Sequence, residues 1–120
     1  MRKIVAGNWK MNMNYHEATK LLDSLIISRS TIPEDVFLVI APPAIYLSEF
    51  SSAIRDYPKL FLAAQNCSNQ DNGAYTGEIS ASMLSSLGIS HCIVGHSERR
   101  EYYGETDVLV NQKIKKLLAE

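Results

Sequence analysis

The stretch VFLVIA, residues 36–41, is apolar at every position and shows no alternation with polar residues. A strand with this pattern has two apolar faces, and both must be covered. Such strands are typical of parallel sheets, whose two faces are both buried. Pro42 and Pro43 follow directly and end the strand, because proline cannot donate to a sheet ladder. The stretch therefore predicts one strand of a parallel sheet.

Three further strands are predicted, and each strand is followed by a helical pattern. The other strands are expected at residues 3–7, 60–66 and 89–95. This β-then-α alternation, repeated four times, implies right-handed crossovers and a parallel sheet. The architecture is then either an open doubly wound sheet or part of a closed barrel. Both place a ligand site at the carboxyl ends of the strands.

Helix boundaries are signalled by capping residues and by apolar spacing. Asn14 with Glu17 forms a capping-box pattern, Thr106 opens the last helix, and Gly88 ends the third. A second helix is expected at residues 44–54. Apolar positions spaced three and four apart predict the inward faces of the first, third and last helices. These positions are Ala18, Leu21, Leu22, Leu25 and Ile26; Ile79, Met83, Leu84 and Leu87; and Val110, Ile114, Leu117 and Leu118.

Composition indicates an ordinary globular domain covering residues 1–120. The chain has 120 residues and a net charge of −1, and its basic residues are scattered, so we expect no nucleic-acid partner. No segment resembles a signal peptide or a membrane span. The two cysteines, Cys67 and Cys92, lack the spacing of a metal site and are expected to be reduced thiols of a cytoplasmic protein.

Polar residues follow the first strand in IVAGNWKMN, residues 4–12. A period of two puts Asn8 and Lys10 on one side and Trp9 on the other. An amide beside an ammonium suits an oxygen-rich anion, since the amide orients the ligand and the cation attracts it. The alternative is a solvated lysine after a strand, with Asn8 forming a turn.

The fourth strand leads into IVGHSERREYYGE, residues 93–105, where His96 precedes a short helical turn that begins near Ser97. The helix dipole and the free N–H groups at a helix N-terminus both disfavour a cationic imidazole. A neutral ring can accept a backbone N–H at one nitrogen and donate from the other to a substrate oxygen. The alternative is a histidine that only caps the helix.

Asn8, Lys10 and His96 are expected at the same end of one sheet, where they would form a donor-rich, cationic patch. Such a patch can stabilise negative charge that develops on an oxygen. No Walker-type loop is present and no GxGxxG follows the first strand, so a nucleotide cofactor is not expected. No metal site is predicted, and no Ser-His-Asp or Cys-His catalytic arrangement can be recognised in the sequence.

Three segments closely resemble the triosephosphate isomerase family: AGNWKMN, QNCSNQDNGAYTGEISASML and IVGHSERREYYGETD. The resemblance extends over the whole chain. It implies an α/β fold of the TIM (β/α)8 barrel family, with residues 1–120 forming the first four β/α units, a half-barrel. It also implies a cofactor-free, cytoplasmic, homodimeric enzyme of glycolysis and gluconeogenesis. Such an enzyme interconverts dihydroxyacetone phosphate and D-glyceraldehyde 3-phosphate through an enediolate.

The resemblance also implies roles for individual residues. His96 would be the electrophile on the substrate oxygens, a neutral histidine being a known feature of this family. Lys10 would supply positive charge and pair with Glu98, and these three residues form the expected catalytic set. Asn8 and Trp9 are expected with Lys10 among the substrate-binding residues. Ser97 is similar to the family serine that meets the catalytic base before the lid closes.

The loop at residues 67–78 resembles the family's dimer loop, with Thr76 as its tip contact across the interface. The alternative is that this segment is a mobile surface loop, because the pair Asn72–Gly73 is a common turn sequence. Long irregular loops in compact domains are usually functional, which favours the first interpretation.

Family members are complete barrels of roughly 250 residues. Their glutamate base, lid and later phosphate-binding loops have no counterpart in these 120 residues. We therefore expect the chain alone to be inactive and to be part of a longer enzyme, with its first and fourth strands as open edges. Two alternatives are a non-catalytic half-barrel that acts as an assembly or dimerisation module, and a different sugar-phosphate barrel enzyme.

Overall fold

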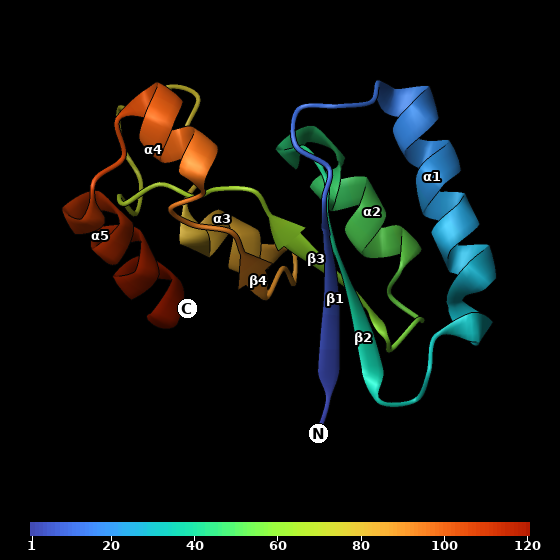
Figure 1. The fold of residues 1–120 in the computed structure, drawn as a ribbon. Helices are drawn as coiled ribbons and strands as arrows, with labels where there is room; N and C mark the ends of the chain where they lie inside the picture. The colour runs from blue at the N-terminus through green and yellow to red at the C-terminus, as the bar shows by residue number, and fades with distance from the viewer.

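The computed structural model describes residues 1–120 and contains one parallel sheet of four strands in the order β1-β2-β3-β4. The strands are β1 (Lys3–Asn8), β2 (Val36–Ala41), β3 (Leu60–Ala64) and β4 (His91–Cys92). The sheet is open, since β1 and β4 each have a single neighbouring strand. Figure 1 shows the strands side by side, with α4 beyond the end to which β1 runs. The predicted half-barrel of parallel strands is confirmed.

A helical segment follows each strand. The helices are α1 (Tyr15–Ile27), α2 (Leu47–Ala53), α3 (Ala81–Ser86), α4 (Ser97–Tyr103) and α5 (Asp107–Leu118), with 3-10 turns η1 (Ser28–Thr31) and η2 (Ala44–Tyr46). The predicted capping box is confirmed: the Asn14 side chain accepts from the Glu17 N–H, and the Glu17 carboxylate accepts from the Asn14 N–H. Thr106 caps α5 as predicted, by accepting the Leu109 N–H.

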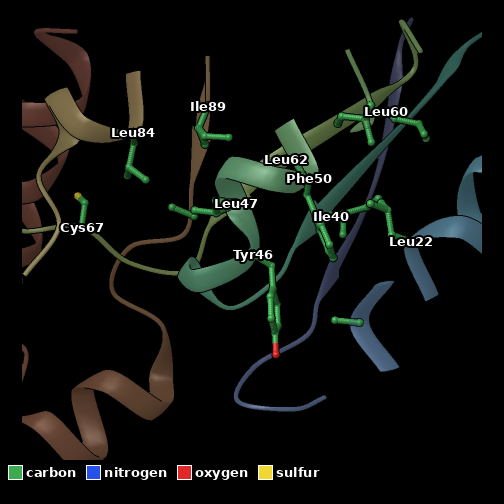
Figure 2. Packing of buried hydrophobic residues seen from close by; sticks show 13 residues of the cluster. Leu22, Ile40, Tyr46, Leu47, Phe50, Leu60, Leu62, Cys67, Leu84 and Ile89 are labelled. Atoms are coloured by element: carbon green, nitrogen blue, oxygen red, sulfur yellow. The ribbon is translucent and has the colours of Figure 1, made fainter. Parts of the chain in front are cut away.

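The main core lies between the sheet and its helices. Alternate strand residues, Ile40 on β2 and Leu60, Leu62 and Ala64 on β3, point into it. Figure 2 shows Ile40, Leu60 and Leu62 in one cluster with Leu22 of α1 and Phe50 of α2. Three small residues on the opposite face of the sheet, Val39, Ala41 and Ala63, form a second cluster. Burial on both faces of β2 explains the unbroken apolar run from which the parallel sheet was predicted.

Several boundary and burial predictions were wrong. β4 has two residues instead of seven, although the Ile93 N–H still donates to the Ala64 carbonyl. Helix α3 is only six residues long and buries Ala81 and Leu84, which leaves the Met83 side chain 53% exposed. The helical segment predicted at residues 44–54 is present, but its first three residues form the 3-10 turn η2 and the α-helix starts at Leu47.

Several apolar residues are also more exposed than the sequence pattern predicted. Leu118, at the last position of α5, is 82% exposed, and Ile114 is partly exposed. On β1, Ile4 and Val5 are exposed because no element covers them. Cys67, predicted in a polar loop, is buried in the main core, because the loop folds back at its base.

Leu22→Ala in the complete protein should lower the free energy of unfolding by about 2–5 kcal/mol, the usual cost of a cavity at a buried leucine. The Leu22 side chain is 2% exposed, and the measurement is urea unfolding followed by circular dichroism. Leu21→Ala is the matched control, because Leu21 is the preceding residue of the same helix and is 36% exposed. Equal losses for the two variants would contradict the assignment of Leu22 to the core.

Candidate functional site

The chain leaves the end of β1 in an unusual backbone conformation. Lys10 has a φ of 55°, in the left-handed region that residues with a side chain seldom occupy. The Asn8 Oδ1 accepts a hydrogen bond from the Lys10 N–H at 2.9 Å, which supports this turn. Strained backbone of this kind persists only where its surroundings over-determine it, and it is concentrated at functional sites.

Gln65, immediately after β3, connects three strand ends. Its Nε2 donates to the Lys10 carbonyl and to the Ala41 carbonyl, at 2.9 Å each. These two bonds fix the Lys10 turn against the ends of β2 and β3. Gln65 was not among the residues predicted from the sequence, where the only local signal is an amide at the end of an otherwise apolar strand.

His96 is the N-cap of α4, as its position before Ser97 predicted. The Glu98 N–H donates to the His96 Nδ1 at 3.0 Å. A nitrogen that accepts an N–H carries no proton, so the ring is neutral in this arrangement and its proton is on Nε2. The imidazole therefore has a donor available for an oxygen of a ligand.

Gly95 determines how the chain enters α4. Its φ is +64°, and a Cβ at this position would lie 3.0 Å from both Cγ atoms of Val110. The Gly95 carbonyl also accepts from the Arg100 Nε at 3.0 Å. Glycine is thus required by the backbone angle and by the close approach of α5. Together these contacts orient the first turn of α4, and with it His96.

An ion pair joins the first and last β/α units. The Lys10 Nζ donates to the Glu98 Oε1 at 2.6 Å, across 88 positions of sequence. The hydrogen bond from Lys10 lowers the pKa of the Glu98 carboxyl below its ordinary value. Both side chains are almost half exposed, so solvent screens the pair and its contribution to stability is small. Its main consequence is positional: it holds the ammonium beside the N-terminus of α4.

A hollow of about 450 Å³ lies at this end of the sheet. Asn8, Lys10, Gln65, His96 and Glu98 all line it, so the predicted patch forms from segments far apart in sequence. The hollow therefore offers an ammonium, an amide and a neutral imidazole donor to one ligand. Such a set can bind an anion and can stabilise negative charge as it develops on an oxygen.

Three of the predicted site residues lie elsewhere. The Trp9 ring packs edge-on against Phe50, with centroids 5.8 Å apart, and belongs to the margin of the core, not to the lining of the hollow. Ser97 is the exposed first residue of α4, and Thr76 is an exposed residue of the 67–78 loop. The Trp9 ring therefore holds the end of β1 against the core, because it lies on the helix side of the sheet.

A buried charge cluster joins α4 to α5 and to Asn66. Glu105 Oε2 accepts from the Arg99 Nε and from the Lys113 Nζ, and the same ammonium also donates to the Asn66 Oδ1 at 2.8 Å. The Glu105 and Lys113 side chains are 2% and 4% exposed. Burial opposes the ionised form of Glu105, but bonds from Lys113 and Arg99 outweigh it and lower the carboxyl pKa. This cluster could not be predicted from the sequence, because its members share no spacing pattern.

The 67–78 loop is fixed at its base. The Ser68 N–H donates to the Ile79 carbonyl at 2.8 Å, which closes the loop. Asn69 bonds to Gln112, and Asp71 pairs with Lys116, so the first half of the loop is attached to α5. These contacts disfavour the alternative of a freely mobile excursion. The loop instead presents residues 75–77 at its exposed end.

No cluster of three or more metal-binding side chains occurs in the structure. None of the helices combines the length and apolarity that a bilayer crossing requires.

Comparison with known proteins shows the family of the chain. The sequence profile described as triosephosphate isomerase matches residues 3–120. A triosephosphate isomerase of Chlorobium phaeovibrioides is 46% identical over 98% of this chain and 47% of its own length. One of Alkaliphilus metalliredigens is 47% identical over 100% of this chain and 48% of its own length. The chain thus spans about half the length of the curated relatives it matches. It belongs to the triosephosphate isomerase family.

Proposed function

We propose that the complete protein interconverts dihydroxyacetone phosphate and D-glyceraldehyde 3-phosphate through an enediolate. The observation that carries this proposal is the neutral His96 ring beside Lys10 in one hollow at the strand ends. Proton removal next to a carbonyl leaves negative charge on that oxygen. The Nε2–H of His96 is the donor that stabilises this charge as it forms.

Lys10 supplies the positive charge of the site. Its ammonium attracts the phosphate of the substrate and lowers the energy of the enediolate. Glu98 keeps the ammonium near His96 when no substrate is bound, through the 2.6 Å ion pair. Asn8 supports the Lys10 turn and presents its amide to the substrate. Trp9 acts indirectly, by holding the end of β1 on the core.

The reaction also requires a general base. Among the carboxylates that line the hollow, Glu98 is held by Lys10 and Glu78 is exposed on the loop. Neither is positioned as a base, so we assign this role to a residue outside the 120 described here. Ser97, exposed at the start of α4, is available to meet that base. The 120 residues alone are then expected to bind phosphate weakly and to be inactive.

We further propose that the complete protein is a cytoplasmic homodimer of glycolysis and gluconeogenesis, joined through the 67–78 loop. The fixed base of the loop and its exposed Thr76 support this proposal. A preorganised loop loses little conformational entropy on docking. A purely non-catalytic assembly module is not favoured, since the polar residues converge on one hollow and the relatives are named as isomerases.

His96→Gln in the complete enzyme should lower kcat by about a hundred- to a thousand-fold, the typical loss for removing one preorganised donor to a developing oxyanion. The measurement is steady-state isomerisation, with circular dichroism to verify the fold. His16→Gln is the matched control, because His16 is exposed on α1, away from the hollow. An unchanged kcat in His96→Gln would remove His96 from the mechanism.

Lys10→Met should weaken the binding of inorganic phosphate by roughly tenfold or more, because a charge-assisted hydrogen bond contributes about 1.5–3 kcal/mol. Isothermal calorimetry measures this affinity without turnover. Lys20→Met, at an exposed position of α1, is the control.

The same Lys10→Met variant tests the ion pair by NMR titration of the Glu98 carboxyl. The Glu98 pKa is lowered in the folded protein, so the pair is intact above the ordinary glutamate range and is lost as the pH falls through the lowered value. In the variant the titration should move up toward the ordinary value. Equal phosphate affinity and an unmoved titration would overturn the role given to Lys10.

Thr76→Glu should raise the dimer dissociation constant at least tenfold, because a carboxylate placed in a docked loop must lose its water. Sedimentation equilibrium measures this constant. Thr31→Glu introduces the same charge at an exposed position of η1 and should leave the dimer unchanged. The docking role of the loop fails if the two variants dimerise equally well.

A further inference from the structure

Cys67 and Cys92 lie on neighbouring segments at the helix side of the sheet. Cys92 pairs in register with Ala64, and Cys67 follows Ala64 by three residues. Cys67 belongs to the main core, and Cys92 packs against that core. Figure 2 shows Cys67 at the edge of the cluster, with its sulfur at the end of the side chain. Both cysteines are free thiols.

The two thiols face the same core from neighbouring segments and have unequal surroundings. The neighbouring Cys92 thiol, and secondarily the Lys113 ammonium, lower the pKa of Cys67 against the opposing effect of burial. The neighbouring Cys67 and burial raise the pKa of Cys92. Lys113 is fixed here because its Nζ donates to the Asn66 Oδ1 at 2.8 Å, one residue before Cys67. Thus Cys67 is the thiol that deprotonates first.

Each thiol also borders a different hollow. Cys67 lines the hollow of about 450 Å³ that contains Lys10 and His96. Cys92 lines a second hollow of about 530 Å³ formed with α3 and α5. A small oxidant that enters the first hollow therefore reaches Cys67 although its surface is almost fully covered.

We propose that Cys67 and Cys92 form a peroxide-sensitive modification site that closes to an intramolecular disulfide. The proposal is independent of the isomerase activity, since it rests on the placement of the two thiols. The reactant is hydrogen peroxide or a similarly small hydroperoxide, because neighbouring atoms cover Cys67 almost completely and leave no room for a larger oxidant.

The chemistry proceeds in two balanced steps. The Cys67 thiolate attacks one peroxide oxygen, so that an S–O bond forms, the O–O bond breaks and hydroxide leaves; sulfur is oxidised and peroxide is reduced. The Cys92 sulfur then attacks the Cys67 sulfur, so that the S–S bond forms and the S–O bond breaks. The departing hydroxide takes the Cys92 proton and leaves as water.

The disulfide would connect the base of the 67–78 loop to β4, which leads to His96 four residues later. Both the loop and the entry to α4 would then be held by a covalent bond. Because the two cysteines face the same core from neighbouring segments, we expect the bond to require only local movement of the two side chains.

Peptide mapping of the complete protein tests the proposal. Reduced native protein is treated with dilute hydrogen peroxide, and the remaining thiols are then alkylated under denaturing conditions. Trypsin alone leaves both cysteines in one peptide, because no lysine or arginine occurs between Lys59 and Arg99. A second protease that cuts after glutamate separates them at Glu78. We expect a disulfide that joins the peptide of residues 60–78 to the peptide of residues 79–98. The mass of the joined species is the sum of the two peptide masses minus two hydrogen atoms, and a reductant separates the peptides again.

Cys92→Ser provides the matched control. In this variant the joined peptides should disappear, and Cys67 should accumulate as a sulfenic acid that dimedone traps. In Cys67→Ser, Cys92 should remain an alkylatable thiol. The proposal is overturned if both wild-type cysteines stay alkylatable after peroxide. It is equally overturned if Cys67 is oxidised to unlinked sulfinic acid, or pairs with a different cysteine.

Discussion

The hydrogen bond from the Glu98 backbone N–H to the His96 Nδ1, 3.0 Å long, fixes both the tautomer and the direction of the imidazole. This bond exists because His96 is the N-cap of α4, where backbone N–H groups have no partner within the helix. A ring held in this way is a donor through Nε2 and cannot act as a base through Nδ1. The proposed electrophile therefore depends on a helix terminus, and that terminus depends on Gly95 and the cluster around Glu105.

The parallel sheet brings Lys10 to this histidine. Each strand of the sheet ends at the same edge, so residues after β1 and β4 meet although 88 positions separate Lys10 from Glu98. Gln65 completes the arrangement, since its amide holds the carbonyls of Lys10 and Ala41. The left-handed backbone of Lys10 is stabilised by these contacts, which direct its ammonium toward α4. The exposed ion pair with Glu98 then keeps the ammonium beside α4, although it contributes little to stability.

Features that depend on a few adjacent residues could be predicted from the sequence. They are the apolar run of β2, the Asn14 capping box and the capping roles of Thr106 and His96. Contacts between distant residues left no such signal. Gln65, the Glu105–Lys113 cluster and the burial of Cys67 became visible only in the fold. Trp9 was placed among the substrate contacts from the motif around it, whereas its ring packs on Phe50.

The ¹⁵N NMR spectrum of the His96 ring in the complete protein at neutral pH tests whether this imidazole can be the electrophile. We predict a neutral imidazole, with a proton on Nε2 and an unprotonated Nδ1 that accepts the Glu98 N–H. A ring protonated on both nitrogens, or one protonated only on Nδ1, would contradict it.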